Sequence, residues 1–185
     1  IKLNAALVIP RDCKGKVKLT GRRDIDIKIN GNSLNFGGDY AGDNCILNVY
    51  SNNHTIEDIS FVKNSKGAGI CVFGRENKIK NNRFGTDKDG NIRSNLYGVV
   101  VSDMFIDDYT GMDGSDNEIL GNDVMHNLGH GVWIRTEGGV IAGNTIQANG
   151  GCPDDDLLSS HDIGCSNQSD ETSAYGIYLG YGAAN

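Results

Sequence analysis

The segment that decides the fold reads Gly69-Ile70-Cys71-Val72 and, four residues later, Asn77-Lys78-Ile79-Lys80-Asn81-Asn82-Arg83-Phe84. Its first part, a glycine followed by three apolar or aromatic residues, recurs at 98–101, 131–134 and 176–179. Its second part recurs at 117–124 and, in a more degenerate form, at 139–146. An internal repeat of this kind specifies the architecture, because each unit buries its apolar residues against the next.

The length of the repeat indicates which kind of repeat it is. Ile56 and Ile79 are 23 positions apart, and Ile119 and Ile141 are 22 positions apart. Apolar and polar residues alternate within each unit, which is the periodicity of strands. Runs of three or four residues bounded by Gly and Asn are too short for helices. The sequence therefore predicts an all-β chain in which each repeat forms one turn of a parallel β-solenoid.

Asparagine recurs at the positions where the chain must turn. Asn tolerates left-handed backbone and bonds readily to neighbouring backbone groups, so it suits a tight corner. Asn82, Asn122 and Asn144 occupy equivalent positions in successive repeats. We expect their side-chain amides to stack as a ladder, each bonded to the next turn of the solenoid.

These repeats resemble those of the right-handed parallel β-helix repeat proteins, over roughly residues 44–182. The stretch 83–91, which contains Gly85-Thr86-Asp87 and Gly90, is similar to a turn of large secreted or surface-anchored bacterial β-helix proteins. The resemblance implies a right-handed parallel β-helix of about six to seven coils with long inserted loops. It also implies one domain over residues 1–185, whole or cut from a longer solenoid, and a secreted, periplasmic or cell-surface location.

Function does not follow from that fold, which pectate-lyase-like polysaccharide enzymes share with adhesins and structural stalks. The net charge and the distribution of apolar residues disfavour some classes of partner. A net charge of −7 disfavours a nucleic-acid partner, and no apolar run is long enough to span a membrane. The spacing between successive apolar triplets grows along the chain, which places insertions at about 86–96, 103–115 and 149–174. Solenoid insertions often gather on the functional face.

The five cysteines allow two interpretations. Cys152 and Cys165 flank a polar loop and either close it as a disulfide, which implies an oxidising compartment, or remain free. Cys13, Cys45 and Cys71 lie in or near predicted strands. We expect these three to be free thiols that pack as small apolar residues.

Alternation along the strands that begin near residues 47, 70, 99, 132 and 177 predicts which side chains enter the core. The expected inward residues are Leu47, Val49, Ile70, Val72, Val99, Val101, Val132, Ile134, Ile177 and Leu179. The same alternation turns Tyr50, Phe73, Trp133 and Tyr178 outward, as an aromatic stripe. Such rings either bind sugar rings or form a second, smaller core under a loop.

Charged side chains cluster near that face. We expect Arg75 to contact substrate with the aromatic stripe, and Arg135, His130, Asp103 and Glu137 to be the catalytic candidates. Polysaccharide lyases need a cation to neutralise a uronate carboxylate and a base to take its α-proton. Gly129-His130-Gly131 also resembles one motif of the polygalacturonases, but the aspartate pair of that motif is missing from the preceding repeat.

The sequence thus supports two functions of different classes. The first is a carbohydrate-binding or polysaccharide-processing β-helix, with a polysaccharide or surface glycan as its ligand; if it is an enzyme, it is a lyase, hydrolase or epimerase. The second is a non-catalytic, adhesin-like or filament-forming module that self-associates through uncapped solenoid ends. No cofactor is expected. Calcium stays open because Asp87, Asp89 and Asn91 place oxygens at alternate positions, although a plain turn fits them better.

Overall fold

The structure is a computed structural model that describes residues 2–3, 7–10, 12–20, 26–29, 45–62, 67–87, 89–102, 114–150 and 176–179. Within those residues it is all-β, without a helix, and its strands form three sheets in which every pairing is parallel. The all-β class and the parallel pairing predicted from the repeats are therefore confirmed.

Each sheet takes one strand from every repeat. Sheet 1 contains, in spatial order, β17 (Ile177–Leu179), β14 (Val132–Arg135), β11 (Tyr97–Ser102), β8 (Ala68–Val72), β5 (Leu47–Val49) and β2 (Leu7–Ile9). Sheet 2 contains β15 (Val140–Ala142), β12 (Glu118–Leu120), β9 (Lys78–Lys80), β6 (Thr55–Glu57) and β3 (Lys18–Thr20). Sheet 3 contains β1 (Lys2–Leu3), β4 (Asp26–Ile29), β7 (Ser60–Phe61), β10 (Arg83–Phe84), β13 (Asp123–Met125) and β16 (Thr145–Gln147).

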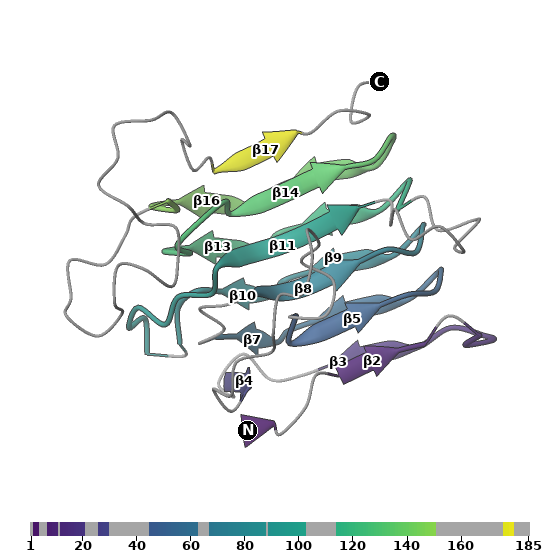
Figure 1. Cartoon of the computed structure of the whole chain (residues 1–185), viewed down its shortest axis with the longest axis horizontal. Helices are drawn as coiled ribbons and strands as arrows, with labels where there is room; N and C mark the ends of the chain where they lie inside the picture. The colour runs from purple at the N-terminus through teal and green to yellow at the C-terminus, as the bar shows by residue number, and fades with distance from the viewer. Residues whose placement is uncertain are drawn as a thin grey trace.

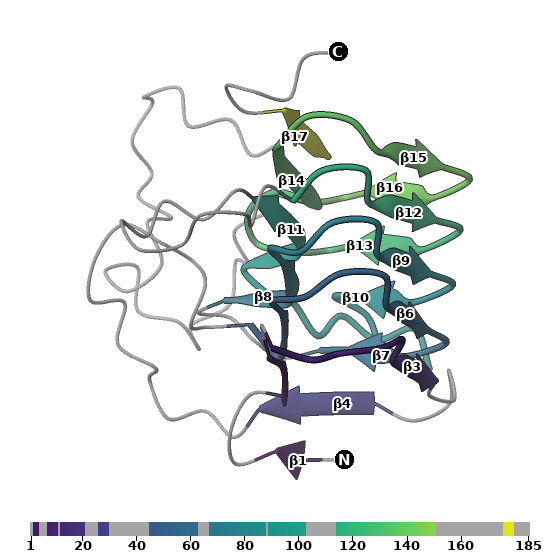
Figure 2. The same cartoon turned by 90° about the vertical axis from the view of Figure 1, so that its right-hand side faces the viewer.

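The chain visits the three sheets in the same order on every pass (Figures 1 and 2). The described residues contain five complete passes, from β2–β3–β4 to β14–β15–β16, with β1 before the first and β17 after the last. Each pass stacks on the one before it, so residues far apart in the sequence become neighbours. Residues 1–43, where the repeat is weakest in the sequence, still contribute β1 to β4.

The pairing register is the one that the repeats predict. Val99 pairs with Ile70 on one side and with Val132 on the other. In sheet 2, Ile119 likewise pairs with Ile79 and with Ile141. A shift of one residue would turn every apolar side chain of a strand to the opposite face, so the repeated apolar positions fix this register.

The main core lies between the three sheets. Eight of the residues expected to point inward are at most 9% exposed: Leu47, Val49, Ile70, Val72, Val99, Val101, Val132 and Ile134. Sheet 3 adds Phe61 and Phe84, whose stacked rings lie 5.2 Å apart. Ile177 and Leu179, also expected to point inward, are 42% and 60% exposed. They are in register with Val132 and Ile134, but β17 is the outermost described strand of sheet 1.

Close packing requires the glycine that opens three of the repeats, at Gly69, Gly98 and Gly131. A Cβ added to Gly98 would lie 2.5 Å from the Gly131 carbonyl oxygen and 2.5 Å from a Val124 methyl group. Both neighbours belong to the packed interior, so neither can move away cheaply. Glycine therefore recurs at this position because the backbone that enters sheet 1 lies too close to the neighbouring strand and to core side chains for a Cβ atom.

The corners between sheets use left-handed backbone at repeated positions. At the corner between sheets 1 and 2 the residues with positive φ include Asn53, Glu76, Asp116 and Gly138. At the corner between sheets 2 and 3 they are Asp58, Asn81, Gly121 and Gly143. Non-glycine residues rarely adopt this conformation, so stacking of successive coils must hold these corners in shape.

The predicted asparagine ladder is present. Asn122 Oδ1 accepts a hydrogen bond from the Asn82 backbone N–H at 2.9 Å, and Asn144 Oδ1 accepts one from Asn122 N–H at 2.7 Å. Two further ladders, which the sequence analysis did not identify, run parallel to it. One contains Asn95, Asn127 and Asn149, and the other contains His54, Asn77 and Asn117.

Some sequence predictions fall on residues outside the described ranges. Asp103, the Cys152–Cys165 pair and most of the insertions at 103–115 and 149–174 are among them. The insertion at 86–96 is described except for residue 88.

Candidate functional site

A second cluster of buried side chains lies on sheet 1, apart from the main core. Its buried members are Cys45, Ala68, Cys71, Phe73 and Val100, and the half-buried Tyr50, Tyr97 and Trp133 pack against them. Alternation explains part of this arrangement, since Cys71 and Val100 follow core residues on their strands. The outward face of sheet 1 is therefore apolar and largely buried over β5, β8 and β11.

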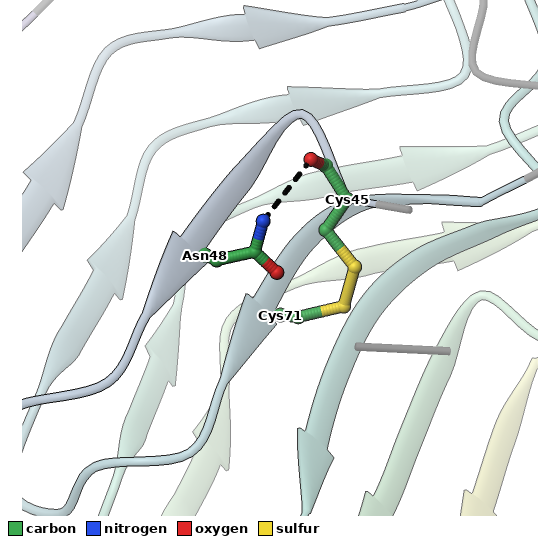
Figure 3. The surroundings of a disulfide bond; sticks show 3 residues. All are labelled: Cys45, Asn48 and Cys71. Carbon is green, nitrogen blue, oxygen red and sulfur yellow. Dashed lines mark hydrogen bonds between the residues drawn. A yellow bond between two sulfur atoms is a disulfide. The ribbon is translucent and has the colours of Figure 1, made fainter. Parts of the chain in front are cut away.

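Cys45 and Cys71 form a disulfide in this cluster (Figure 3). The prediction that both are free thiols is wrong, whereas Cys13 is free. The two bonded cysteines are 26 residues apart, slightly more than one repeat, so the chain returns to Cys45 one coil later. That spacing was a signal in the sequence: cysteines one repeat apart become neighbours in a solenoid.

Asn48 lies beside the disulfide and pairs in register with Cys71. Its side-chain nitrogen donates to the Cys45 carbonyl at 3.4 Å, and its Oδ1 is buried without a hydrogen-bond partner among the described residues. An unsatisfied buried acceptor of this kind destabilises the fold locally.

Four rings gather where β11, β14 and β17 lie side by side. His130 is stacked between Tyr97, at 5.7 Å between ring centroids, and Tyr178, at 4.8 Å. Trp133 lies against the same two tyrosines, at 5.6 Å from Tyr97 and 6.3 Å from Tyr178. We call these four residues the ring cluster. Trp133 and Tyr178 are directly paired across β14 and β17.

The ring cluster differs from the predicted aromatic stripe. Tyr50 and Phe73 stack on each other at 5.1 Å, on strands at the other side of sheet 1. Phe73 is only 3% exposed and belongs to the second cluster, so for this ring the structure agrees with the alternative of a smaller second core. Tyr178, at 37% exposed, is the most open ring of the four predicted residues.

Tyr97 is the member that the sequence analysis missed. It immediately precedes a repeat glycine, Gly98, as His130 precedes Gly131. This shared position places both rings at the start of adjacent strands of sheet 1. Burial raises the pKa of the Tyr97 hydroxyl, so the phenol stays protonated at neutral pH and can donate a hydrogen bond.

The described catalytic candidates are spread along β14. His130 precedes the strand and Arg135 ends it, and the four residues of the strand span about 10 Å. Glu137 follows in the next corner and is exposed. Arg75 lies at the equivalent corner after β8, separated from Glu137 by two strand spacings, or about 10 Å. Arg135 and Glu137 therefore lie near each other at the end of β14, whereas His130 lies at the other end of the strand, in the ring cluster.

The 86–93 turn is organised around one carboxylate. Asp87 Oδ1 accepts hydrogen bonds from the backbone N–H groups of Asp89, at 3.0 Å, and Asn91, at 2.9 Å. Arg93 lies 3.4 Å from its other oxygen. Burial alone would raise the pKa of Asp87, but these hydrogen bonds, the Asn91 amide and the Arg93 charge outweigh burial and lower it. These donors occupy the oxygens that a calcium ion would use, which favours the plain turn.

The described ranges contain no group of three or more His, Cys, Asp or Glu side chains placed to hold a metal ion. No helix in them is long and apolar enough to cross a membrane.

Comparison of the chain with protein-family models, curated proteins and solved structures finds no match.

Proposed function

We propose that the chain is a right-handed parallel β-helix that binds carbohydrate through the ring cluster. The fold assignment is supported by the three parallel sheets, which the chain visits in constant order. The handedness rests on the general rule that crossovers between parallel strands are right-handed in about 98% of cases.

The ring cluster is the observation that carries the binding proposal. Tyr97, His130, Trp133 and Tyr178 bring four flat side chains together at one place on sheet 1. Aromatic rings with a polar edge are suited to ligands that combine apolar faces with hydroxyl groups, as sugars do. The Trp133 indole N–H is buried without an acceptor among the described residues, so the ring cluster contains an unsatisfied donor.

Arg135 adds a preference for acidic sugars. It ends the strand that carries Trp133, and both side chains are half-buried, while Val132 and Ile134, which alternate with them, are buried. The alternation places Trp133 and Arg135 on the same side of the sheet. A guanidinium at that place would form a charge-assisted contact with a uronate carboxylate.

We expect Trp133→Ala to weaken glycan binding by more than 1 kcal/mol, or roughly fivefold or more, as truncation of an aromatic anchor does. A glycan array identifies the best ligand, and isothermal titration with oligogalacturonate and a neutral oligosaccharide measures the affinity. Arg135→Ala should weaken binding of the acidic ligand more than that of the neutral one.

Tyr50→Ala is the matched control, because Tyr50 is also a half-buried ring of the second cluster but lies three strands away from β14. Its affinity for either glycan should match that of the wild type. Equal affinities for all three variants, or no glycan binding by the wild type, would contradict the proposal.

The burial of Phe73, Cys71 and Val100 favours a second candidate, a non-catalytic structural module. In such a module the outward face of sheet 1 is mainly a second core. Edge strands with exposed apolar residues, among them Val8, Val140 and Leu179, would then stack on another copy. Light scattering that rises steeply with protein concentration, in a protein without glycan affinity, would support this candidate.

The Cys45–Cys71 disulfide supports a secreted, periplasmic or cell-surface location, because disulfides persist in oxidising compartments. It closes a loop of 26 residues and should stabilise the fold by about 3 kcal/mol through the unfolded chain. We expect non-reducing peptide mapping of the folded protein to recover the two cysteines in one linked peptide, and a Cys45→Ala/Cys71→Ala variant to lose that stability. Recovery of both as free thiols would contradict this assignment.

A further inference from the structure

His54 occupies an asparagine position. It stands in the ladder with Asn77 and Asn117, at the corner between sheets 1 and 2. On each rung of that ladder a side-chain atom accepts a hydrogen bond from the backbone N–H of the preceding coil. Asn117 Oδ1 accepts from Asn77 N–H and Asn77 Oδ1 accepts from His54 N–H, both at 2.8 Å. His54 continues the series, because its Nδ1 accepts from Val17 N–H at 3.0 Å.

These contacts define the protonation state of the ring. Val17 N–H can only donate, so Nδ1 of His54 must carry a lone pair rather than a proton. Nε2 therefore holds the ring proton and donates it to Ser51 Oγ, 2.7 Å away. A doubly protonated His54 would direct an N–H at the Val17 N–H, and the rung would be lost.

The surroundings of His54 favour its neutral form. The side chain is fully buried, and burial lowers its pKa from the ordinary value of 6.5. The charged side chains on the adjacent coils lie in solvent and are not among the causes of the shift. They are Asp12, Lys14, Lys16 and Lys18 on the preceding coil and Arg75, Glu76 and Lys78 on the following one.

A second titratable side chain joins the same two coils. The Glu57 carboxylate forms an ion pair with Lys18 Nζ at 2.5 Å and accepts a hydrogen bond from the Thr20 hydroxyl at 3.1 Å, both from β3. It forms a second ion pair with Lys80 Nζ, from β9, at 2.9 Å. The hydrogen bonds from Lys18 and Lys80 lower the pKa of Glu57 to about 2. Glu57 therefore stays charged at pH values where the imidazole of an unfolded histidine is already protonated.

We propose that His54 is an acid-sensitive latch that holds the 12–20 segment, including β3, on the rest of the stack. Because the folded protein keeps His54 neutral, protons bind the open state first as the pH falls below 6.5. The latch is at full strength above that pH and weakens as the pH falls toward the lower folded-state pKa. Glu57 acts later, since its contribution is present above pH 4.5 and is lost as the pH falls toward 2.

Amide hydrogen exchange tests the latch directly. We expect the protection factor of Val17 N–H to fall below pH 6.5 by about tenfold per pH unit, until the folded-state pKa is reached. The amide of Ile59 is an internal control, because its acceptor is Asn82 Oδ1, which does not titrate. Its protection should change much less over the same range.

Variants separate His54 from the other titrating groups. His54→Asn restores the residue type found at the equivalent rungs and should abolish the fall in Val17 protection between pH 7 and 5. His126→Asn replaces a half-buried histidine that already has positive φ, and it should leave the fall unchanged. Glu57→Gln should preserve the fall in Val17 protection that begins below pH 6.5 and alter only the change below pH 4.5.

Two results would overturn the proposal. One is constant Val17 protection in the wild type from pH 7 to pH 5. The other is an equal loss at Val17 and Ile59, which would show unfolding of the whole chain. Neither result depends on whether any variant folds, because both are measured on the wild-type protein.

Discussion

Val101→Asp should abolish folding. Val101 is 2% exposed and lies in the main core, paired in register with Val72 and Ile134 on the adjacent strands. A carboxylate at that position would be buried without a cationic or hydrogen-bonding partner, which costs several kcal/mol or more. Since domains are stable by about 5–15 kcal/mol in total, we expect loss of the β-type far-UV spectrum and of a cooperative thermal transition.

Val140→Asp is the control for that substitution. The chemistry is identical, but Val140 is 50% exposed on β15, the outermost described strand of sheet 2. We expect a change of about 1 kcal/mol or less, as for other surface substitutions. A folded, cooperatively melting Val101→Asp protein would show that the interior between the three sheets is not packed as the structure has it.

The elements best predicted from sequence are those that the repeat specifies. Strand alternation and the spacing between Ile56 and Ile79 sufficed to place both residues as paired neighbours. The ladder through Asn82 was predictable for the same reason, since equivalent positions in a solenoid must stack. His54 was missed because the ladder tolerates a different residue type with an equivalent acceptor, and a search for asparagine overlooks it.

The candidate site was less predictable. Alternation correctly separated Trp133 from the core residues beside it, but it does not say what covers an outward face. Phe73 and Trp133 have the same pattern in sequence, yet one is buried and the other half-buried. Long insertions also interrupt the repeat near this face, and local periodicity carries no information about their paths.

Asn122→Ala should be the most destabilising polar substitution in the ladders, with an expected loss of about 4 kcal/mol. Asn122 is fully buried. Its Oδ1 accepts from both the backbone N–H and the side-chain amide of Asn82, and its Nδ2 donates to the Ile79 carbonyl at 2.8 Å and to Asn144 Oδ1 at 2.9 Å. Removing the amide leaves the buried Asn82 N–H and Ile79 carbonyl unsatisfied, and each unmade bond costs about 1–3 kcal/mol.

Chemical denaturation measures this loss, and Gln147→Ala provides the control. Gln147 is also an amide but is exposed on β16, where the only hydrogen bond described for its side chain is a donation to the Met125 sulfur. Its loss should change the free energy of unfolding by about 0.5 kcal/mol or less. If Asn122→Ala had an equally small effect, water would have to reach the freed backbone groups, and the ladder would contribute little to holding successive coils together.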